Sequence, residues 1–142
     1  MVIKTGFVGR YQHNLDEKNR VSLPAKIKKY IEEVAASPEF GERIMLTKGP
    51  DNCIEGFMVS DWQMMAEKVK INMSFKRNQE DEELEEIAMN ADQVTIDKSG
   101  RIMINAELKK HAGLGKNAVF VGAIDRFRIW NPEKLAEKYK GR

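Results

Sequence analysis

Two aspartate–arginine pairs in this sequence share one spacing. Asp16 precedes Arg20 by four positions, and Asp97 precedes Arg101 by the same distance. An arginine can bind a phosphate or form two parallel hydrogen bonds with a guanine edge, and a neighbouring carboxylate can orient it. The same pair can also be a structural ion pair that pins a turn, which contributes about 0–1 kcal/mol when it is exposed. The residues alone leave both interpretations open, and the two are compatible.

The residues around these pairs form an internal repeat. Residues 15–30 align with residues 96–111, with five identical positions and four exchanges of one apolar residue for another. The apolar residues alternate after each arginine, which predicts a half-buried strand. Asn19 and Gly100 occupy equivalent positions just before the arginines, and both residue types tolerate a positive φ. Each copy therefore predicts a tight turn that brings its aspartate and arginine together.

The likeness continues more loosely beyond the repeat, so that each half predicts strand, turn, strand, helix, strand, strand and helix. Ser60 and Asn131 are expected to cap the last helix of each half, with Pro132 at a first helical position. Asn105 can cap the short helix of the second copy, and Gly113 can end it. A unit this small buries little apolar surface alone. The strands of the two copies, or of two chains, are therefore expected to intertwine.

The sequence predicts four segments. They are a first unit at 5–59, a helical connector at 60–90, a second unit at 91–134 and a C-terminal helix or tail at 135–142. Six of the seven residues 80–86 are acidic. Such a run indicates a solvated helix face, or an acidic surface that complements a basic region of a neighbouring subunit.

Charge is segregated along the chain. The 142 residues carry a net charge of +2, but residues 1–31 carry +5, residues 32–97 carry −10 and residues 98–142 carry +7. Basic regions favour polyanionic partners, because neutralising phosphates releases counterions. They are also compatible with two ordinary solvated surfaces.

Several kinds of site and location are not expected from this sequence. No apolar run approaches the roughly 20 residues of a membrane span, and the N-terminus does not resemble a secretory signal. Cys53 is the only cysteine, so we expect a cytoplasmic protein with a buried, inert thiol. His13 and His111 have no cysteines at metal-binding spacing, and no phosphate-binding glycine loop is present. We therefore expect no metal, no cofactor and no enzymatic activity.

Four blocks together resemble the MraZ family, which belongs to the AbrB-like swapped-hairpin DNA-binding proteins. The blocks read FVGRYQHNLDEKNRVSLPAKIKKYI, CIEGF…W, IDKSGRIMINAELKKHAGL and VFVG…FRIW. The resemblance runs from Phe7 to about Trp130, and its most specific element is Asp-x-x-x-Arg, present twice. The sequence departs from the family pattern at Asn19, where glycine is usual, at Asn105, where proline is usual, and at Arg128, where an acidic residue is common.

The resemblance implies an α+β fold, a double-split β-barrel built from two tandem swapped-hairpin units with short helices. It implies a homo-oligomeric ring of eight or twelve chains and a cytoplasmic, nucleoid-associated transcriptional regulator without a cofactor. The implied partner is double-stranded DNA with short direct repeats, in the promoter of the protein's own operon in the division and cell-wall gene cluster. The alternative is an antitoxin-like or protein-interaction module, which swapped-hairpin folds also provide.

The resemblance also assigns the site. The DNA-contacting arginine of the family falls on Arg20, and Asp16 is expected to orient it. Arg101 and Asp97 match the motif in the second copy. The expected DNA-binding set is Arg10, Asn14, Asp16, Lys18, Arg20, Asp97 and Arg101.

Overall fold

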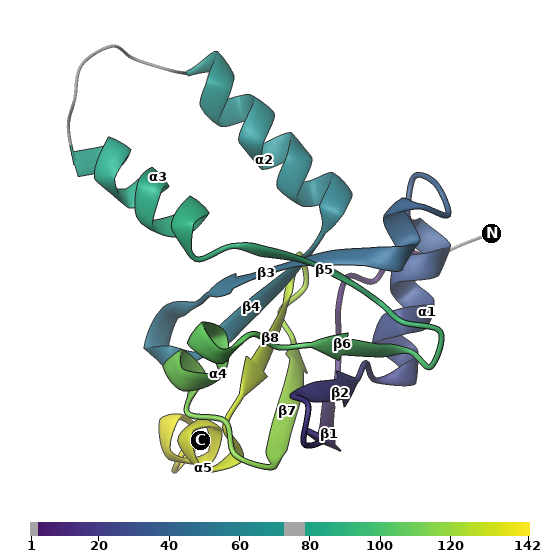
Figure 1. Cartoon of the computed structure of the whole chain (residues 1–142), viewed down its shortest axis with the longest axis vertical. Helices are drawn as coiled ribbons and strands as arrows, with labels where there is room; N and C mark the ends of the chain where they lie inside the picture. Colours follow the sequence, from purple (N-terminus) through teal and green to yellow (C-terminus); the bar gives the residue numbers. More distant parts are fainter. Residues whose placement is uncertain (1–2, 73–78) are drawn as a thin grey trace.

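The computed structural model describes residues 3–72 and 79–142, and it is a mixed α+β fold (Figure 1). The first half contains β1 (Arg10–Asn14), β2 (Arg20–Ser22), α1 (Ala25–Val34), β3 (Arg43–Lys48), β4 (Ile54–Met58) and α2 (Val59–Ile71). After α3 (Gln79–Met89), the second half contains β5 (Asp92–Thr95), β6 (Arg101–Met103), α4 (Ala106–Ala112), β7 (Asn117–Gly122), β8 (Phe127–Trp130) and α5 (Pro132–Lys138). The predicted α+β class is confirmed, as is the order of elements within each half.

The two halves exchange their first strands. One sheet has six antiparallel strands in the order β1-β7-β8-β4-β3-β5, and β2 pairs with β6 in a second, two-stranded sheet. Within the described ranges these strands do not close into a barrel. The counterparts in the two halves are β1 and β5, β3 and β7, and β4 and β8. When each strand is replaced by its counterpart, the same strand order is obtained in reverse. The halves are therefore related by a local two-fold axis, and they intertwine within one chain as the small size of each unit predicts.

One core fills the space between the two sheets. Val21 and Ile102, at the centre of β2 and β6, lie opposite each other and are both buried. Ile27 and Ile31 enter the same core from α1, and Leu108 enters it from α4. One face of α1 therefore packs inward. Because both halves contribute to this core, neither half buries its apolar residues alone.

On the opposite face of the six-stranded sheet, α5 packs against the strands and the start of α2 contacts β4. Leu135 of α5 packs against Cys53, Val119 and Trp130, all of which are buried. At the start of α2, the Trp62 ring lies 5.8 Å from the Phe57 ring of β4. Helix α5 and the start of α2 therefore lie on this face, and the two-stranded sheet lies on the other side.

Three of the four predicted helix boundaries are confirmed. Asn105 Oδ1 accepts a hydrogen bond from Leu108 N at 2.9 Å, and Asn131 Oδ1 accepts hydrogen bonds from two backbone N–H groups at the start of α5. Gly113 ends α4 in the left-handed conformation, with a φ of 62°. The prediction for Ser60 is wrong. Strand β4 continues directly into α2, so that Ser60 lies inside the first helical turn and Met58 occupies the capping position.

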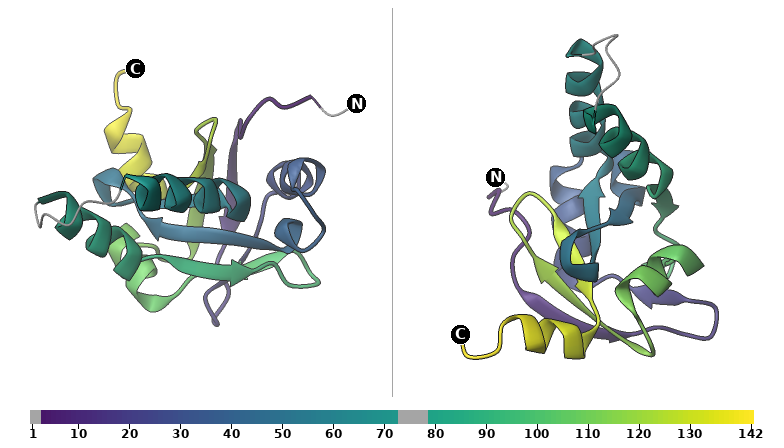
Figure 2. Two further views of the ribbon diagram at one scale, coloured as in Figure 1. Left: turned by 90° about the horizontal axis from the view of Figure 1, so that it is seen from above. Right: turned by 90° about the vertical axis from the view of Figure 1, so that its left-hand side faces the viewer.

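The predicted helical connector contains two helices in its described part, since residues 73–78 lie outside the described ranges. The pair α2–α3 projects away from the sheets, on the opposite side from α1 and the N-terminus (Figure 2). The described acidic residues of the predicted run, 81–86, are exposed together with Leu84. Large apolar side chains are also exposed on this pair, namely Met64, Met65, Val69, Ile71, Leu84, Ile87 and Met89. Among residues 3–72 and 79–142, no helix is both long enough and apolar enough to cross a membrane.

Candidate nucleic-acid interface

The turn between β1 and β2 is closed by the carboxylate of Asp16. Its Oδ1 accepts hydrogen bonds from the backbone N–H groups of Lys18 and Arg20, both at 2.9 Å, and its Oδ2 accepts one from Arg20 Nε at 2.8 Å. Asn19 has a φ of 61°, and its N–H donates to the Asp16 carbonyl at 3.1 Å. One side chain therefore fixes the backbone of the turn and the direction of the guanidinium group.

The turn between β5 and β6 repeats this geometry. Asp97 Oδ1 accepts from the N–H groups of Ser99 and Arg101, both at 2.9 Å, and Oδ2 accepts from Arg101 Nε at 3.1 Å. Gly100 has a φ of 78°, which matches the position of Asn19. The predicted proximity of aspartate and arginine, and the positive-φ position between them, are confirmed in both copies.

These hydrogen bonds stabilise the charged form of both carboxylates. The backbone N–H of Arg20 is the main cause that lowers the pKa of Asp16, and the backbone N–H of Arg101 does the same for the pKa of Asp97. Burial opposes the shift in both cases. Each aspartate is therefore an ionised partner of its arginine near neutral pH.

The lowered pKa values predict acid sensitivity of both turns. A folded-state pKa below the ordinary value of 3.8 means that these bonds stabilise the fold above that pH. The stabilisation is lost as the pH falls through the folded-state pKa values. In a carboxyl-carbon NMR titration, we expect Asp16 and Asp97 to have midpoints below the ordinary aspartate value of 3.8. Midpoints at or above the ordinary value for both aspartates would contradict the geometry.

The two arginines lie on one face of the two-stranded sheet β2–β6, which we call the ribbon. Arg20 lies opposite Met103 and Ser22 opposite Arg101, and their side chains alternate with the buried central pair. Diagonal neighbours on one face of such a pair are about 7–8 Å apart. Arg101 Nη1 lies 3.9 Å from Asp16 Oδ2, so the two turns also contact each other. The ribbon therefore presents two oriented guanidinium groups side by side on one outward face.

Each turn is held by groups from the other copy. Leu23 N–H donates to the Gly100 carbonyl, and Ile104 N–H donates to the Asn19 carbonyl, both at 2.9 Å. Lys109 Nζ of α4 donates to Asn19 Oδ1 at 2.8 Å. Lys109 is not among the site residues expected from the sequence. Lys109 is identical to its counterpart in the repeat, Lys28, which lies beside Gly100 as Lys109 lies beside Asn19. This identity is the sequence signal that could have indicated Lys109.

Substitution of Asn19 separates backbone strain from the loss of its hydrogen bond with Lys109. We expect Asn19→Gly to lose only this hydrogen bond, which contributes about 0.5–1.5 kcal/mol. Asn19→Ala loses the same bond and also forces an alanine into positive φ, which costs about 1–2 kcal/mol more. Urea denaturation of the two variants measures the difference. Equal free energies of unfolding would show that φ at this position imposes no cost.

The other three residues of the expected DNA-binding set do not lie together in the structure. Lys18 is exposed at the tip of the first turn, and Asn14 is exposed at the end of β1, two residues before Asp16. Arg10 is also exposed, but it lies at the start of β1, about 13 Å of strand away from Asn14. Arg10 therefore lies away from the first turn along β1, and its place in the expected DNA-binding set stays a prediction. The strand runs away from the turn, and Arg10 pairs with Val121 at the far end of β7.

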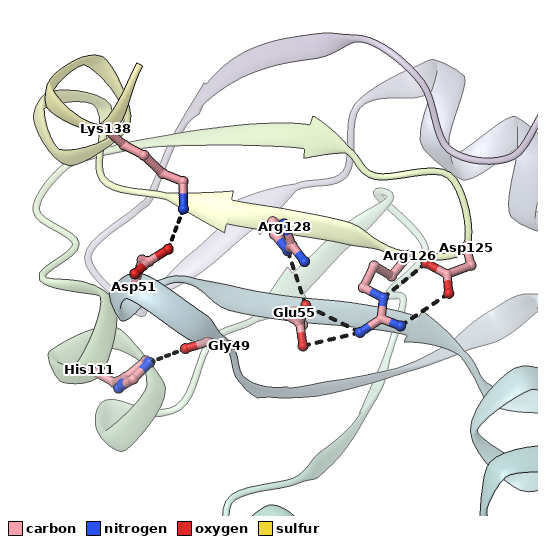
Figure 3. Close-up of polar contacts among 8 residues, drawn as sticks. All are labelled: Gly49, Asp51, Glu55, His111, Asp125, Arg126, Arg128 and Lys138. Atoms are coloured by element: carbon pink, nitrogen blue, oxygen red, sulfur yellow. Dashed lines mark hydrogen bonds and ion pairs between the residues drawn. The ribbon is translucent and has the colours of Figure 1, made fainter. Parts of the chain in front are cut away.

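A second ionic cluster lies on the other face of the six-stranded sheet (Figure 3). Glu55 of β4 is 8% exposed, and its Oε2 lies 3.0 Å from Arg128 Nε and 3.4 Å from Arg126 Nη1. The Arg126 side chain also bonds Asp125, which lowers the pKa of that carboxyl. Arg128 thus ties β8 to β4. This cluster is structural and lies apart from the ribbon.

Other side chains considered in the sequence have structural surroundings. Cys53 is fully buried, and burial raises the pKa of its thiol to about 11, so that the predicted inert thiol is confirmed. His111 lies near the C-terminal end of α4, with Nε2 3.1 Å from the Gly49 carbonyl oxygen. In the part of the chain that the structure describes, no group of three or more His, Cys, Asp or Glu side chains is arranged to hold a metal ion.

The fold and the site define a class of protein, an internally duplicated α+β chain whose halves exchange strands and present one arginine-bearing ribbon. A family model described as "MraZ protein, putative antitoxin-like" matches residues 7–85 and 87–139. The chain belongs to the MraZ family.

Proteins of several bacteria are similar to this chain over most of its length. A protein of Clostridium tetani is 33% identical over 92% of this chain and 85% of its own length. A protein of Caldanaerobacter subterraneus is 34% identical over 94% of this chain and 86% of its own length. One of Lactobacillus delbrueckii is 36% identical over 92% of this chain and 85% of its own length. Each of the three is named "Transcriptional regulator MraZ".

Proposed function

We propose that this protein is a transcriptional regulator that binds specific DNA sequences through the ribbon. The observation that carries the proposal is the pair of oriented arginines, Arg20 and Arg101, on one outward face of two short strands. The major groove of B-DNA admits a two-stranded β-ribbon, and an arginine can bond the O6 and N7 atoms of a guanine there. The names of the relatives support the same function.

The residues of the ribbon and its turns have distinct roles in this proposal. Arg20 reads a base edge, and Arg101 makes a similar contact from the second copy. Asp16 and Asp97 orient these arginines through the Nε bonds already described. Exposed Lys18 holds a phosphate, which contributes affinity without sequence information.

Asn14 and Arg10 follow β1 away from the turn. Asn14 lies close enough to the first turn to contact a phosphate beside the ribbon. Because Arg10 lies at the other end of the strand, its part is restricted to a more distant phosphate or to a neighbouring chain's DNA segment.

The proposed target is a set of short direct repeats in the promoter of the protein's own operon, in the division and cell-wall gene cluster. The protein acts on this promoter by binding alone, without catalysis and without a cofactor. Its proposed location is the cytoplasm, in association with the nucleoid. One ribbon makes few contacts and binds weakly. Several ribbons on one assembly contact successive repeats, so that affinity comes from multivalency.

The proposed assembly is a homo-oligomeric ring of eight or twelve chains. The α2–α3 pair supports self-association, because large apolar side chains of both helices are exposed together, and contiguous exposed apolar patches mark interaction sites. Met65, Val69, Leu84 and Ile87 line a groove of about 400 Å³ between the two helices. We also propose that the two sheets and their shared core correspond to the double-split β-barrel of swapped hairpins, with the units at 5–59 and 91–134.

Binding of the full chain to a fragment upstream of its own gene tests this function. We expect a mobility shift that survives excess competitor DNA and a footprint over repeated short sequences. The apparent affinity should fall steeply between about 50 and 200 mM salt, since phosphate contacts release counterions. Equal affinity for the upstream fragment and for a scrambled fragment of the same composition would contradict the proposal.

An antitoxin-like or protein-interaction module is the second candidate. The description of the family model and the exposed apolar groove between α2 and α3 favour it. Affinity purification from the native host distinguishes the two candidates. Recovery of one stoichiometric protein partner, together with no specific binding to the upstream fragment, would favour the interaction module over the regulator.

A further inference from the structure

The outward face of strands β2 and β6 is almost symmetric, and these two strands differ on that face only at the positions beside the arginines. The local two-fold axis makes Arg20 and Arg101 counterparts, and it makes Ser22 and Met103 counterparts. Arg20 therefore has a methionine directly across the ribbon, while Arg101 has a serine. Met103 is 55% exposed, although the apolar residues on either side of it are buried.

This asymmetry matters if the protein binds direct repeats, so the inference rests on the proposed function. Direct repeats have a direction along the DNA, and every chain on them must bind in the same orientation. A reader with two identical ends binds a short site equally well in either orientation. Some group on the ribbon must therefore distinguish its two ends.

We propose that Met103 contacts the C5-methyl group of a thymine beside the base that Arg20 reads, and thereby sets the orientation of each chain on a repeat. The thymine methyl is the apolar group that the major groove displays. A methionine side chain is unbranched and polarisable, which suits contact with one methyl group. Ser22, at the equivalent position beside Arg101, is short and polar and offers no such contact.

The distances on the ribbon fit adjacent base pairs. Residues directly opposite on two antiparallel strands have Cβ atoms about 4.5–5.5 Å apart. Arg20 and Met103 therefore reach positions separated by about one base-pair step. The turns also differ, with Glu17 and Lys18 in the first and Lys98 and Ser99 in the second. These positions lie at the turn tips, where contacts to phosphates carry no sequence information and do not distinguish the two orientations on a repeat.

Removal of the thymine methyl tests the contact. The probe is the fragment upstream of the protein's own gene, amplified with thymidine or with deoxyuridine nucleotides. We expect the wild-type protein to bind the deoxyuridine fragment about fourfold more weakly for each thymine methyl group that Met103 touches. Met103→Ser should bind the thymidine fragment about as weakly and show no further weakening on the deoxyuridine fragment. Val8→Ser, which changes an exposed apolar residue before β1, away from both the ribbon and the α2–α3 pair, should respond as the wild type does.

Exchange of the two residues tests the orientation. On a single repeat, hydroxyl-radical footprints of the wild type should be asymmetric about its centre. The double variant Ser22→Met, Met103→Ser should give the mirror-image footprint, because the methionine now lies beside Arg101. Circular dichroism of each variant shows whether the fold is kept, which we expect since Met103 is exposed.

Two results would overturn the inference and leave DNA binding in place. One is a wild-type protein that binds both fragments equally, and the other is a Met103→Ser variant that keeps the full sensitivity to deoxyuridine. Absence of specific binding to either fragment would instead contradict the proposed function, and the inference with it.

Discussion

Arg20→Ala is expected to abolish sequence-specific DNA binding and to leave the assembly intact. A bidentate contact of arginine with guanine is worth about 1–3 kcal/mol for one site. The loss is repeated in every chain of an oligomer that binds several repeats, so the specific complex should disappear in a mobility-shift titration. Asp16 keeps its backbone hydrogen bonds from Lys18 and residue 20 in the variant, so the turn should still form.

Two further variants separate charge from geometry in this experiment. Arg20→Lys keeps the positive charge but lacks the planar fork, so it should retain non-specific binding and lose discrimination between the promoter and scrambled DNA. Lys140→Ala removes one exposed charge far from the ribbon and should change specific binding little. Size-exclusion chromatography with light scattering checks that the variants have the wild-type mass. Specific binding of Arg20→Ala at the wild-type level would remove Arg20 from the site.

Gly56→Ala is expected to destabilise the fold severely. Gly56 lies opposite Phe127 where β4 meets β8, and an added Cβ would overlap the ring of Phe127. That ring is completely buried in the core, so it cannot move into solvent. Overpacking of this kind costs about 1–3 kcal/mol, and the lack of space places Gly56 at the upper end. Chemical denaturation should show the loss in the free energy of unfolding.

Gly115→Ala is the matched control. No heavy atom lies within 4 Å of the position that its Cβ would occupy, and the residue is exposed. Its free energy of unfolding should change by no more than about 0.5 kcal/mol. If both alanine variants unfold at the same denaturant concentration, the close contact between β4 and Phe127 is not a constraint on the fold.

Local features of this molecule were predictable because they depend on residues close in sequence. The Asp16 turn needs only the carboxylate, a residue that tolerates positive φ and the arginine, and the same holds for Asp97. The caps at Asn105 and Asn131 were predictable for the same reason. The Ser60 cap was not, because no local signal shows that β4 continues into α2 without a break.

Long-range features were predictable only in outline. The small size of each unit indicates that strands must intertwine, but it does not say that β1 pairs with β7. Without that pairing, nearness in sequence assigns Arg10 to the hairpin, while the strand actually carries it away from Arg20. The hydrogen bond between Lys109 and Asn19 joins residues 90 positions apart. The spacing of apolar residues along the chain does not indicate such a contact, although both residues lie within the internal repeat.

The pair Glu55–Arg128 has a consequence for the history of this duplicated chain. The two residues are counterparts, and they lie opposite each other where β4 and β8 meet on the local two-fold axis. In a dimer of two identical half-length chains, a residue on that axis faces its own copy, which would place glutamate against glutamate or arginine against arginine. A chain that contains both halves can place opposite charges there, because its two halves can differ in sequence. At this position each half is therefore complementary to the other half and not to a copy of itself.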